Sequence, residues 1–111
     1  MRFRIGELDQ RVKILKEARA SDGMGGSTRT WEEVANVAAH VRPLSGRERA
    51  RADRLDAEGG YMVAIRWRPD VRENMVIEWL NRDRRMNIRH VDDGGGRSMY
   101  LSIQCDTGVA T

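Results

Sequence analysis

Apolar and polar residues alternate along most of this chain, and the alternation predicts a mainly β protein. The clearest example is YMVAIRWR, residues 61–68, in which Arg66 and Arg68 fall on one face and Trp67 on the other. Successive side chains of a strand point to opposite faces, so a period of two indicates a strand with one buried face. The inward set of this run is predicted to be Tyr61, Val63, Ile65 and Trp67.

Five more segments alternate in the same way. They are LDQRVKIL, TWEEVANVAAHVRPL, MVIEWL, RMNIRHV and SMYLSIQC. A glycine-rich stretch at about residues 20–29 separates the first two and is expected to be a flexible loop. The alanines of VANVAA also suit a helix. The residues expected to face inward are Leu8, Val12, Ile14, Val37, Ala39, Val41, Met75, Ile77, Trp79, Met86, Ile88, Met99, Leu101, Ile103 and Cys105.

About six short strands joined by turns favour a small antiparallel β-barrel or sandwich with long loops. Short strands in an open sheet leave unpaired edges that invite aggregation, and closure into a barrel removes those edges. The fold class expected from the pattern is therefore mainly β.

One segment, PLSGRERARADRLDAEGG, predicts a helix over residues 46–58. Ser45 with Glu48 three residues later forms a capping-box pattern, and the glycines at the end supply a stop. Leu55 is the only large apolar residue in the body, so the helix has no apolar stripe to pack against a core. We expect a polar helical insertion at about residues 44–60 that is exposed or is ordered by a neighbouring subunit.

Length and composition indicate one small domain. The chain has 111 residues, of which 33% are charged and 40% hydrophobic. A chain of this length buries roughly two thirds of its unfolded surface, which suffices for one compact core over residues 1–111 and excludes a large multi-domain enzyme. No stretch approaches the ~18 uncharged apolar residues of a membrane span, and the start lacks the apolar region of a signal peptide. We therefore expect no membrane partner and an unanchored protein in the cytoplasm.

Residue types that carry chemistry are few and scattered. His40 and His90 are the only histidines and have no metal-ligand spacing, while Cys105 falls in an inward apolar row. Asp92 and Asp93 precede three glycines, which makes them turn formers rather than a general acid and base. Neither glycine-rich run has the lysine and the following helix of a phosphate-binding loop. We expect no catalytic residue, no cofactor and no metal site.

Charge is nearly balanced but unusual in kind. The chain has 20 basic and 17 acidic residues, a net charge of +3, and 18 of the 20 bases are arginine. Arginine makes bidentate contacts to carboxylates and phosphates, so the bias favours interfaces, although a GC-rich genome also produces it. Arg84, Arg85 and Arg89 are expected on an outward strand face. The candidate interface residues are Arg47, Glu48, Arg51, Arg54, Glu58, Arg66, Arg68 and Trp31.

Five segments occur in a characteristic order: IGELDQRVKIL, ASDGMGGSTRTWEEV, NVAAHVRPLSGRE, YMVAIRWRPDV and VIEWLNRDRRMNIRHV. In this order and spacing, over residues 5–106, the chain resembles the phage head-tail joining family. Its members are small head-completion proteins, also called stoppers or head-tail adaptors, of long-tailed phages and gene transfer agents. The chain departs from the pattern at RDRRMNIRHV, where the family has a shorter turn with an aromatic residue before the isoleucine.

The resemblance implies a small β-barrel that serves as a structural subunit of a head-tail connector ring of six or twelve copies. Such a ring closes the DNA-filled head below the portal and adaptor, and it provides the docking surface for the tail terminator and tail. The resemblance also implies a place in the neck of the virion after assembly in the host bacterial cytoplasm. Packaged DNA in the lumen needs no sequence-specific contact. The segment 44–60 and the loop 20–29 are expected to be ordered by neighbours or to reach into the channel.

Two other functions fit the same residues. One is a free small-barrel nucleic-acid-binding module, which the arginines and Trp31 suggest. The other is a different neck or tail protein with a related barrel, such as a terminator or tube subunit, and composition does not separate this from the connector ring.

Overall fold

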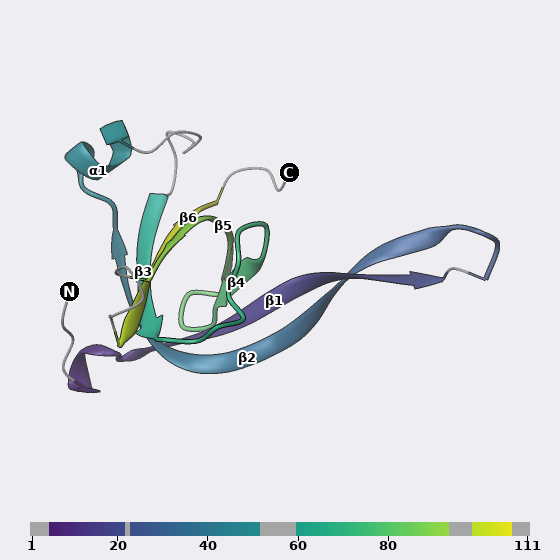
Figure 1. Cartoon of the computed structure of the whole chain (residues 1–111), viewed down its shortest axis with the longest axis horizontal. Helices are drawn as coiled ribbons and strands as arrows, with labels where there is room; N and C mark the ends of the chain where they lie inside the picture. Colours follow the sequence, from purple (N-terminus) through teal and green to yellow (C-terminus); the bar gives the residue numbers. More distant parts are fainter. Residues whose placement is uncertain (1–4, 22, 52–59, 94–98, 108–111) are drawn as a thin grey trace.

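The structure is a computed structural model that describes residues 5–21, 23–51, 60–93 and 99–107. Its elements are a 3₁₀ turn η1 (Ile5–Glu7), a short helix α1 (Gly46–Arg51) and the strands β1 (Gln10–Ser21), β2 (Ser27–Pro43), β3 (Gly60–Arg66), β4 (Val76–Trp79), β5 (Arg84–Asp92) and β6 (Tyr100–Asp106). The strands form a closed barrel in the order β1-β2-β3-β6-β5-β4 with antiparallel neighbours (Figure 1). The predicted mainly β fold with one short helix is confirmed.

The barrel closes because β1 pairs with β2 along one edge and with β4 along the other. Val12 lies opposite Val37 on β2 and opposite Trp79 on β4. The segment VANVAA, which also suited a helix, lies within β2. Inward positions from all six strands meet in one core, as the alternation predicts. The buried core consists of Val12, Ile14, Ala39, Val63, Ile65, Val71, Met75, Ile77, Met86, Ile88, Leu101, Ile103 and Cys105.

The inward row of β3 ends earlier than the sequence pattern predicts. The strand stops at Arg66, so Trp67 lies beyond the sheet with 47% of its surface exposed. The backbone N–H of Trp67 donates to the carbonyl of Met99 at 2.8 Å, and Met99 is itself 77% exposed. The predictions of Trp67 and Met99 as core residues are wrong, because alternation identifies a face but not the point at which a strand leaves the barrel.

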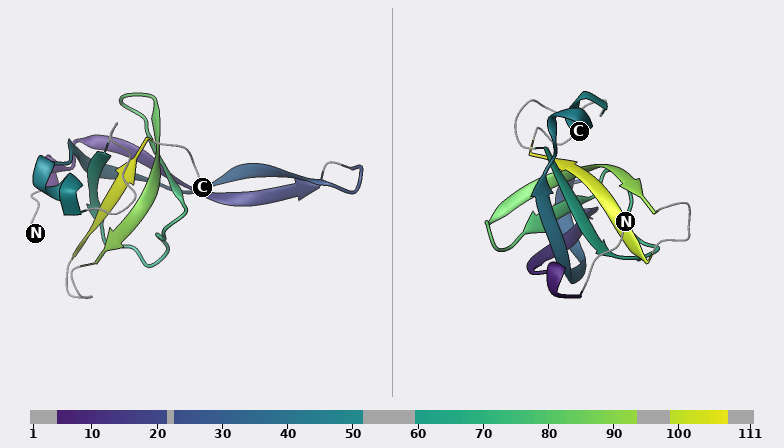
Figure 2. Two further views of the ribbon diagram at one scale, coloured as in Figure 1. Left: turned by 90° about the horizontal axis from the view of Figure 1, so that it is seen from above. Right: turned by 90° about the vertical axis from the view of Figure 1, so that its left-hand side faces the viewer.

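Half of the predicted loop at residues 20–29 is strand, namely residues 20–21 and 27–29. β1 and β2 pair without a break from Lys16↔Glu32 to Ser21↔Ser27, and residues 23–26 are outside the strands. These paired ends leave the barrel as a two-stranded arm, here residues 16–21 and 23–32, which projects away from α1 (Figures 1 and 2). The arm lengthens the molecule to 49 × 29 × 28 Å. The loop prediction holds at residues 23–26 and is wrong at residues 20–21 and 27–29, because exposed strands of a ribbon need no apolar alternation.

A bulge in β5 turns one arginine from the surface into the barrel wall. The pairing of β5 with β6 shifts between Ile88 and His90, so Arg89 is an extra residue and the outward alternation breaks there. Its side chain is only 15% exposed and pairs with Asp106. Arg84 also departs from the expectation, because it lies two residues before Met86 and therefore on the same, inward face of β5 as Met86 and Ile88. Of the three arginines expected on one outward face, Arg85 alone lies there.

Candidate functional site

The arm is polar and exposed on both faces. Among its described residues only Ala18 and Trp31 are half-buried. Its cross-strand contacts are surface contacts: Lys16 Nζ lies 3.9 Å from the Glu32 carboxylate, and Arg29 Nε lies 3.4 Å from that of Glu17. Exposed ion pairs contribute about 0–1 kcal/mol each, and a two-stranded ribbon alone is marginally stable in water. The arm therefore has far less intrinsic stability than the barrel.

Trp31 is the largest side chain of the arm. It lies opposite Glu17 in the ribbon, and the guanidinium of Arg29 sits 4.7 Å from its ring centroid. At the tip, Met24 is 91% exposed between Gly23 and Gly25, which adopt φ values of 79° and 84°. An aromatic ring and an apolar tip on an otherwise polar ribbon give the arm two side chains suited to contact with another protein.

α1 is tied to β2 by a bidentate ion pair. Arg42 Nη1 and Nη2 donate to Glu48 Oε1 and Oε2 at 2.7 and 2.8 Å. The backbone N–H of Ser45 donates to Glu48 Oε1 at 2.9 Å, and the N–H of Glu48 donates to Ser45 Oγ at 3.2 Å. The predicted capping box is confirmed. Hydrogen bonds from Arg42 and from the Ser45 backbone lower the pKa of Glu48 to about 2.

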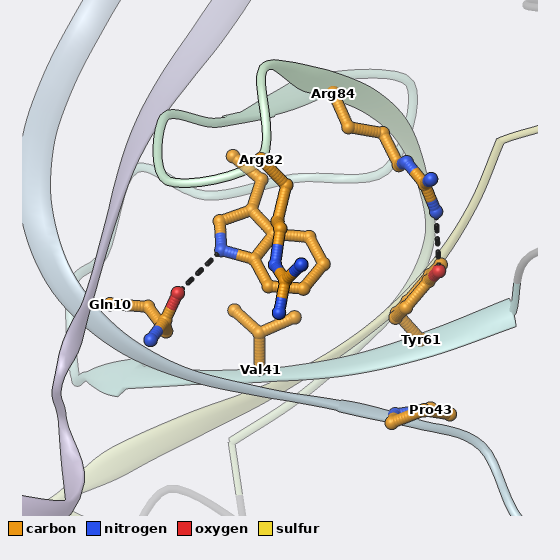
Figure 3. A pocket seen from close by; sticks show the side chains of 7 residues that line it. Gln10, Val41, Pro43, Tyr61, Arg82 and Arg84 are labelled. Atoms are coloured by element: carbon orange, nitrogen blue, oxygen red, sulfur yellow. Dashed lines mark hydrogen bonds between the residues drawn. The ribbon is translucent and has the colours of Figure 1, made fainter.

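The barrel opens beside α1 into a hollow of about 390 Å³ that we call the mouth pocket (Figure 3). Most of its lining continues the inward rows past the packed core. Tyr61 extends the row of Val63 and Ile65, and Gln10 extends that of Val12. The pocket is lined by Gln10, Val41, Pro43, Tyr61, Trp79, Arg82 and Arg84.

The side chains of the mouth pocket hold one another in place. Trp79 Nε1–H donates to Gln10 Oε1 at 2.9 Å, and the rings of Tyr61 and Trp79 meet edge to face with centroids 5.7 Å apart. Arg84 donates to the Tyr61 hydroxyl, and Arg82 places its guanidinium 5.8 Å from the Trp79 ring centroid (Figure 3). The pocket thus presents two cationic groups above an aromatic and aliphatic floor.

The structure does not gather the predicted interface residues into one patch. Trp31 lies in the arm, whereas Arg47 and Glu48 lie in α1 on the far side of the molecule (Figure 1). Arg66 is exposed at the end of β3. Two members are engaged within the chain. Glu48 pairs with Arg42, and Arg68 donates to Asp70 at 3.0 and 2.9 Å.

Three further members of the predicted interface fall in the helical insertion. For Arg51 the structure describes the backbone at the end of α1. Arg54 and Glu58 lie outside the described residues, as does the predicted helix end at residue 58.

Groups with reactive chemistry are held apart or buried. Cys105 is fully buried, and burial raises the pKa of its thiol, so the reactive thiolate is suppressed. His90 Nδ1 lies 3.8 Å from Glu73 Oε1 on the surface. In the described part of the chain, no three His, Cys, Asp or Glu side chains converge as a metal site. Within those same residues, no helix combines the length and apolar composition that a membrane crossing requires.

Comparison with known proteins decides the family. Residues 3–108 match the family described as phage head completion protein. The chain belongs to the phage head completion protein family. Membership gives it a structural role in the phage head, as a virion component that assembles with other virion proteins.

One curated relative carries the same description, and two solved structures share the fold. The head completion protein gp7 of Enterobacteria phage HK97 is 27% identical over 107 residues, which cover 94% of this chain and 96% of gp7. The solution structure of protein SF1141 from Shigella flexneri 2a is similar with a TM-score of 0.77 and 25% identity, covering 98% of this chain and 100% of that one. A chain in the virion of a native gene transfer agent particle shares the fold, with a TM-score of 0.62, 19% identity and coverage of 93% and 96%.

Sequence reasoning missed the mouth pocket of this head completion protein. Trp79 and Tyr61 were predicted to face inward, but nothing marked them as the last residues of their rows. The available signal was parity: Arg84 falls two residues before Met86, so it occupies an inward position of β5. A charged residue at an inward position points either to a buried pair or to the open end of a barrel.

Proposed function

We propose that this protein is a subunit of a head-tail connector ring that closes the DNA-filled head below the portal and adaptor and provides the docking surface for the tail. The observation that carries the proposal is the family match over residues 3–108. Completing a filled head requires sealing the opening through which DNA entered, and a ring of identical subunits can line such an opening. We take residues 1–111 as one head-tail joining domain and expect six or twelve copies.

The arm and α1 support this proposal because they offer distinct surfaces at opposite ends of the molecule (Figure 2). In a cyclic ring each copy contacts its neighbours through two different surfaces, and the contacts close by rotation. A polar ribbon that is marginally stable alone gains stability when a neighbour covers it. We assign the arm with Trp31 to the contact between adjacent copies.

The remaining predicted interface residues fit contacts with other neck proteins. Arg47 on α1 and Arg66 at the end of β3 are exposed. We assign Arg47 with Arg51, Arg54 and Glu58 of the segment 44–60 to one neighbouring protein, and Arg66 with Arg68 to the opposite one. Glu48 serves this surface indirectly, because its pair with Arg42 fixes the start of α1.

Deleting the gene from its phage tests the proposal. We expect particles that package DNA but lose it and carry no tails, and a plasmid copy of the wild-type gene restores both properties. The purified wild-type particle should contain the protein at the neck in a ring visible by cryo-electron microscopy. Deletion particles that keep their DNA and bear tails would show that the protein has another role.

A salt titration separates this role from the nucleic-acid-binding alternative. Fluorescence anisotropy with a labelled duplex at two salt concentrations should show negligible affinity for the isolated protein. Tight binding with a steep salt dependence, the signature of several released counterions, would favour the free nucleic-acid-binding module.

A further inference from the structure

The mouth pocket holds two guanidinium groups that no carboxylate of the described residues neutralises. No carboxylate in the described part of the chain lies within ion-pairing distance of Arg82 or Arg84, and each packs against an aromatic ring instead. Four other arginines of the barrel and its adjoining turn differ in that each is paired with a carboxylate. The paired ones, with their partners, are Arg42 with Glu48, Arg68 with Asp70, Arg85 with Glu78 and Arg89 with Asp106. Two unpaired arginines oriented over rings form a preorganised anion site.

The apolar floor of the pocket means that a ligand needs an apolar group as well as an anionic group. Val41, Pro43, Tyr61 and Trp79 line the same hollow as the two guanidinium groups. Val41, Tyr61 and Trp79 pack on the core and are only half-buried. A ligand that satisfies both parts carries a carboxylate next to an aliphatic side chain, and a volume of about 390 Å³ accommodates such a pair of side chains.

Nucleic acid fits this site less well than protein does. Trp79 has its N–H bonded to Gln10, its ring in an edge-to-face contact with Tyr61 and a guanidinium over one face, so the face that Arg82 covers is closed to a stacking base. Gripping a nucleic-acid backbone takes a row of free cations, and the nearby Arg42 and Arg85 are already paired. Two exposed guanidinium groups beside one hollow match one or two carboxylates.

In a second copy of this chain, most carboxylates on the described strands and on α1 are already engaged in ion pairs. Every acidic side chain of β1, β2, α1, β4 and β6 is in an ion pair with a basic residue of its own chain. We infer that the mouth pocket binds an acidic segment of a different protein, with a carboxylate between Arg82 and Arg84 and an aliphatic side chain against Val41 and Pro43. This inference rests on the pocket and holds whatever position the subunit takes in the particle.

A peptide titration followed by NMR tests the inference on the full chain. The probe is a capped hexapeptide, Glu-Glu-Leu-Glu-Glu-Leu, at about 0.15 M salt, and its matched control has Gln in place of Glu. The acidic peptide should produce a saturable shift of the Trp79 indole N–H and the Gln10 side-chain amide, while the indole signals of Trp31 and Trp67 stay in place. The Gln peptide should leave all of them unchanged.

Variants locate the binding. Arg82→Gln should lower the affinity for the acidic peptide by on the order of tenfold. The double variant Arg82→Gln with Arg84→Gln should lower it further, because each substitution removes a charge-assisted contact. The Arg82 side chain makes no described hydrogen bond, and its backbone N–H bond to the Trp79 carbonyl is kept in Arg82→Gln, so the single variant keeps the pocket intact. Arg85→Gln, which removes a paired outward arginine, should leave the affinity unchanged.

Four results would overturn the inference. The first two are an absence of saturable shifts and an equal response to the Gln peptide. The third is stronger binding of a single-stranded oligothymidylate than of the acidic peptide, which would make the pocket a nucleic-acid site. The fourth is self-association of the wild-type chain that Arg82→Gln abolishes, which would make a second copy the occupant.

Discussion

Arg89 and Asp106 form an ion pair inside the barrel wall: Arg89 Nε donates to Asp106 Oδ2 at 2.8 Å. The Asp106 side chain is fully buried, and 15% of the Arg89 side chain is exposed. The pair depends on the bulge between Ile88 and His90, which turns Arg89 away from the outward face of β5. A buried carboxylate needs such a partner because desolvation penalises its charge.

Removing one partner of this pair should strongly destabilise the fold. We expect Arg89→Leu to lower the free energy of unfolding by about 3–5 kcal/mol, because it leaves a buried carboxylate without its counter-ion. Chemical denaturation measures the change. Arg85→Leu is the matched control, since Arg85 and Glu78 pair near the surface, and it should change stability by less than about 1 kcal/mol. Equal effects of the two substitutions would contradict the buried pair.

The Arg42–Glu48 pair should make stability depend on pH in the acid range. The pKa of Glu48 is lowered from 4.5 in its ordinary state to about 2 in the fold. A depressed carboxylate pKa stabilises the folded state above the unfolded pKa, and this stabilisation is lost as the pH falls through the folded value. The stability difference between wild type and Glu48→Gln should thus be full above pH 4.5 and shrink toward pH 2.

Two measurements check this pH dependence. Denaturation midpoints of wild type and Glu48→Gln are compared across the acid range, and the carboxyl carbon shift of Glu48 is followed by NMR. Asp70, whose pKa is also lowered by Arg68, titrates in both proteins, so it cancels in the comparison. A constant difference across the range would show that the pair does not lower the pKa of Glu48.

The two tryptophans of the predicted inward rows should lose stability to different extents on truncation. Trp79→Ala should lower the free energy of unfolding by about 3 kcal/mol, because its ring packs on the core and its N–H bonds to Gln10. Trp67→Ala should cost less than about 1 kcal/mol, since the ring is 47% exposed beyond the end of β3. Thermal or chemical unfolding distinguishes them, and a larger loss at Trp67 would reverse the placement of these two rings.

Shortening the arm should separate folding from assembly. Replacing residues 18–30 by Asn-Gly joins Glu17 to Trp31, which already face each other in the ribbon, through a two-residue turn. We expect the barrel to keep its stability within about 1 kcal/mol, because the removed side chains are mostly exposed. In the phage, this variant should fail to replace the wild-type gene in tail joining. A variant that assembles normally would remove the arm from the proposed subunit contact.

Much of the barrel could be predicted from the pattern of apolar and polar residues. Alternation identified the inward faces of all six strands, including Val12, Ile65 and Ile103, because a strand with one buried face must alternate. The capping box at Ser45 and Glu48 was also readable, since a helix start is satisfied by residues three apart in sequence. These features depend on contacts or exposures that repeat locally along the chain.

Other features could not be predicted from the pattern of apolar and polar residues. The arm was missed because a ribbon exposed on both faces has no reason to alternate, and its strands are defined by pairing such as Glu17↔Trp31. Trp67 was misplaced because alternation continued one residue pair past the end of β3. The candidate interface residues, from Trp31 to Arg68, were chosen by charge and type, which give no information about where they meet in space.

The sequence by itself determined the faces of the strands, the helix start and the family. Burial periodicity and capping depend on residues close together in the chain, and the order of motifs can be read directly along it. Only the tertiary structure decided where each strand leaves the barrel and which charges are paired. It placed Arg89 inside the wall beside Asp106 and left Arg82 and Arg84 open at the mouth. Pairing and closure join residues far apart in the chain, and a single bulge or strand end changes the environment of every side chain beyond it.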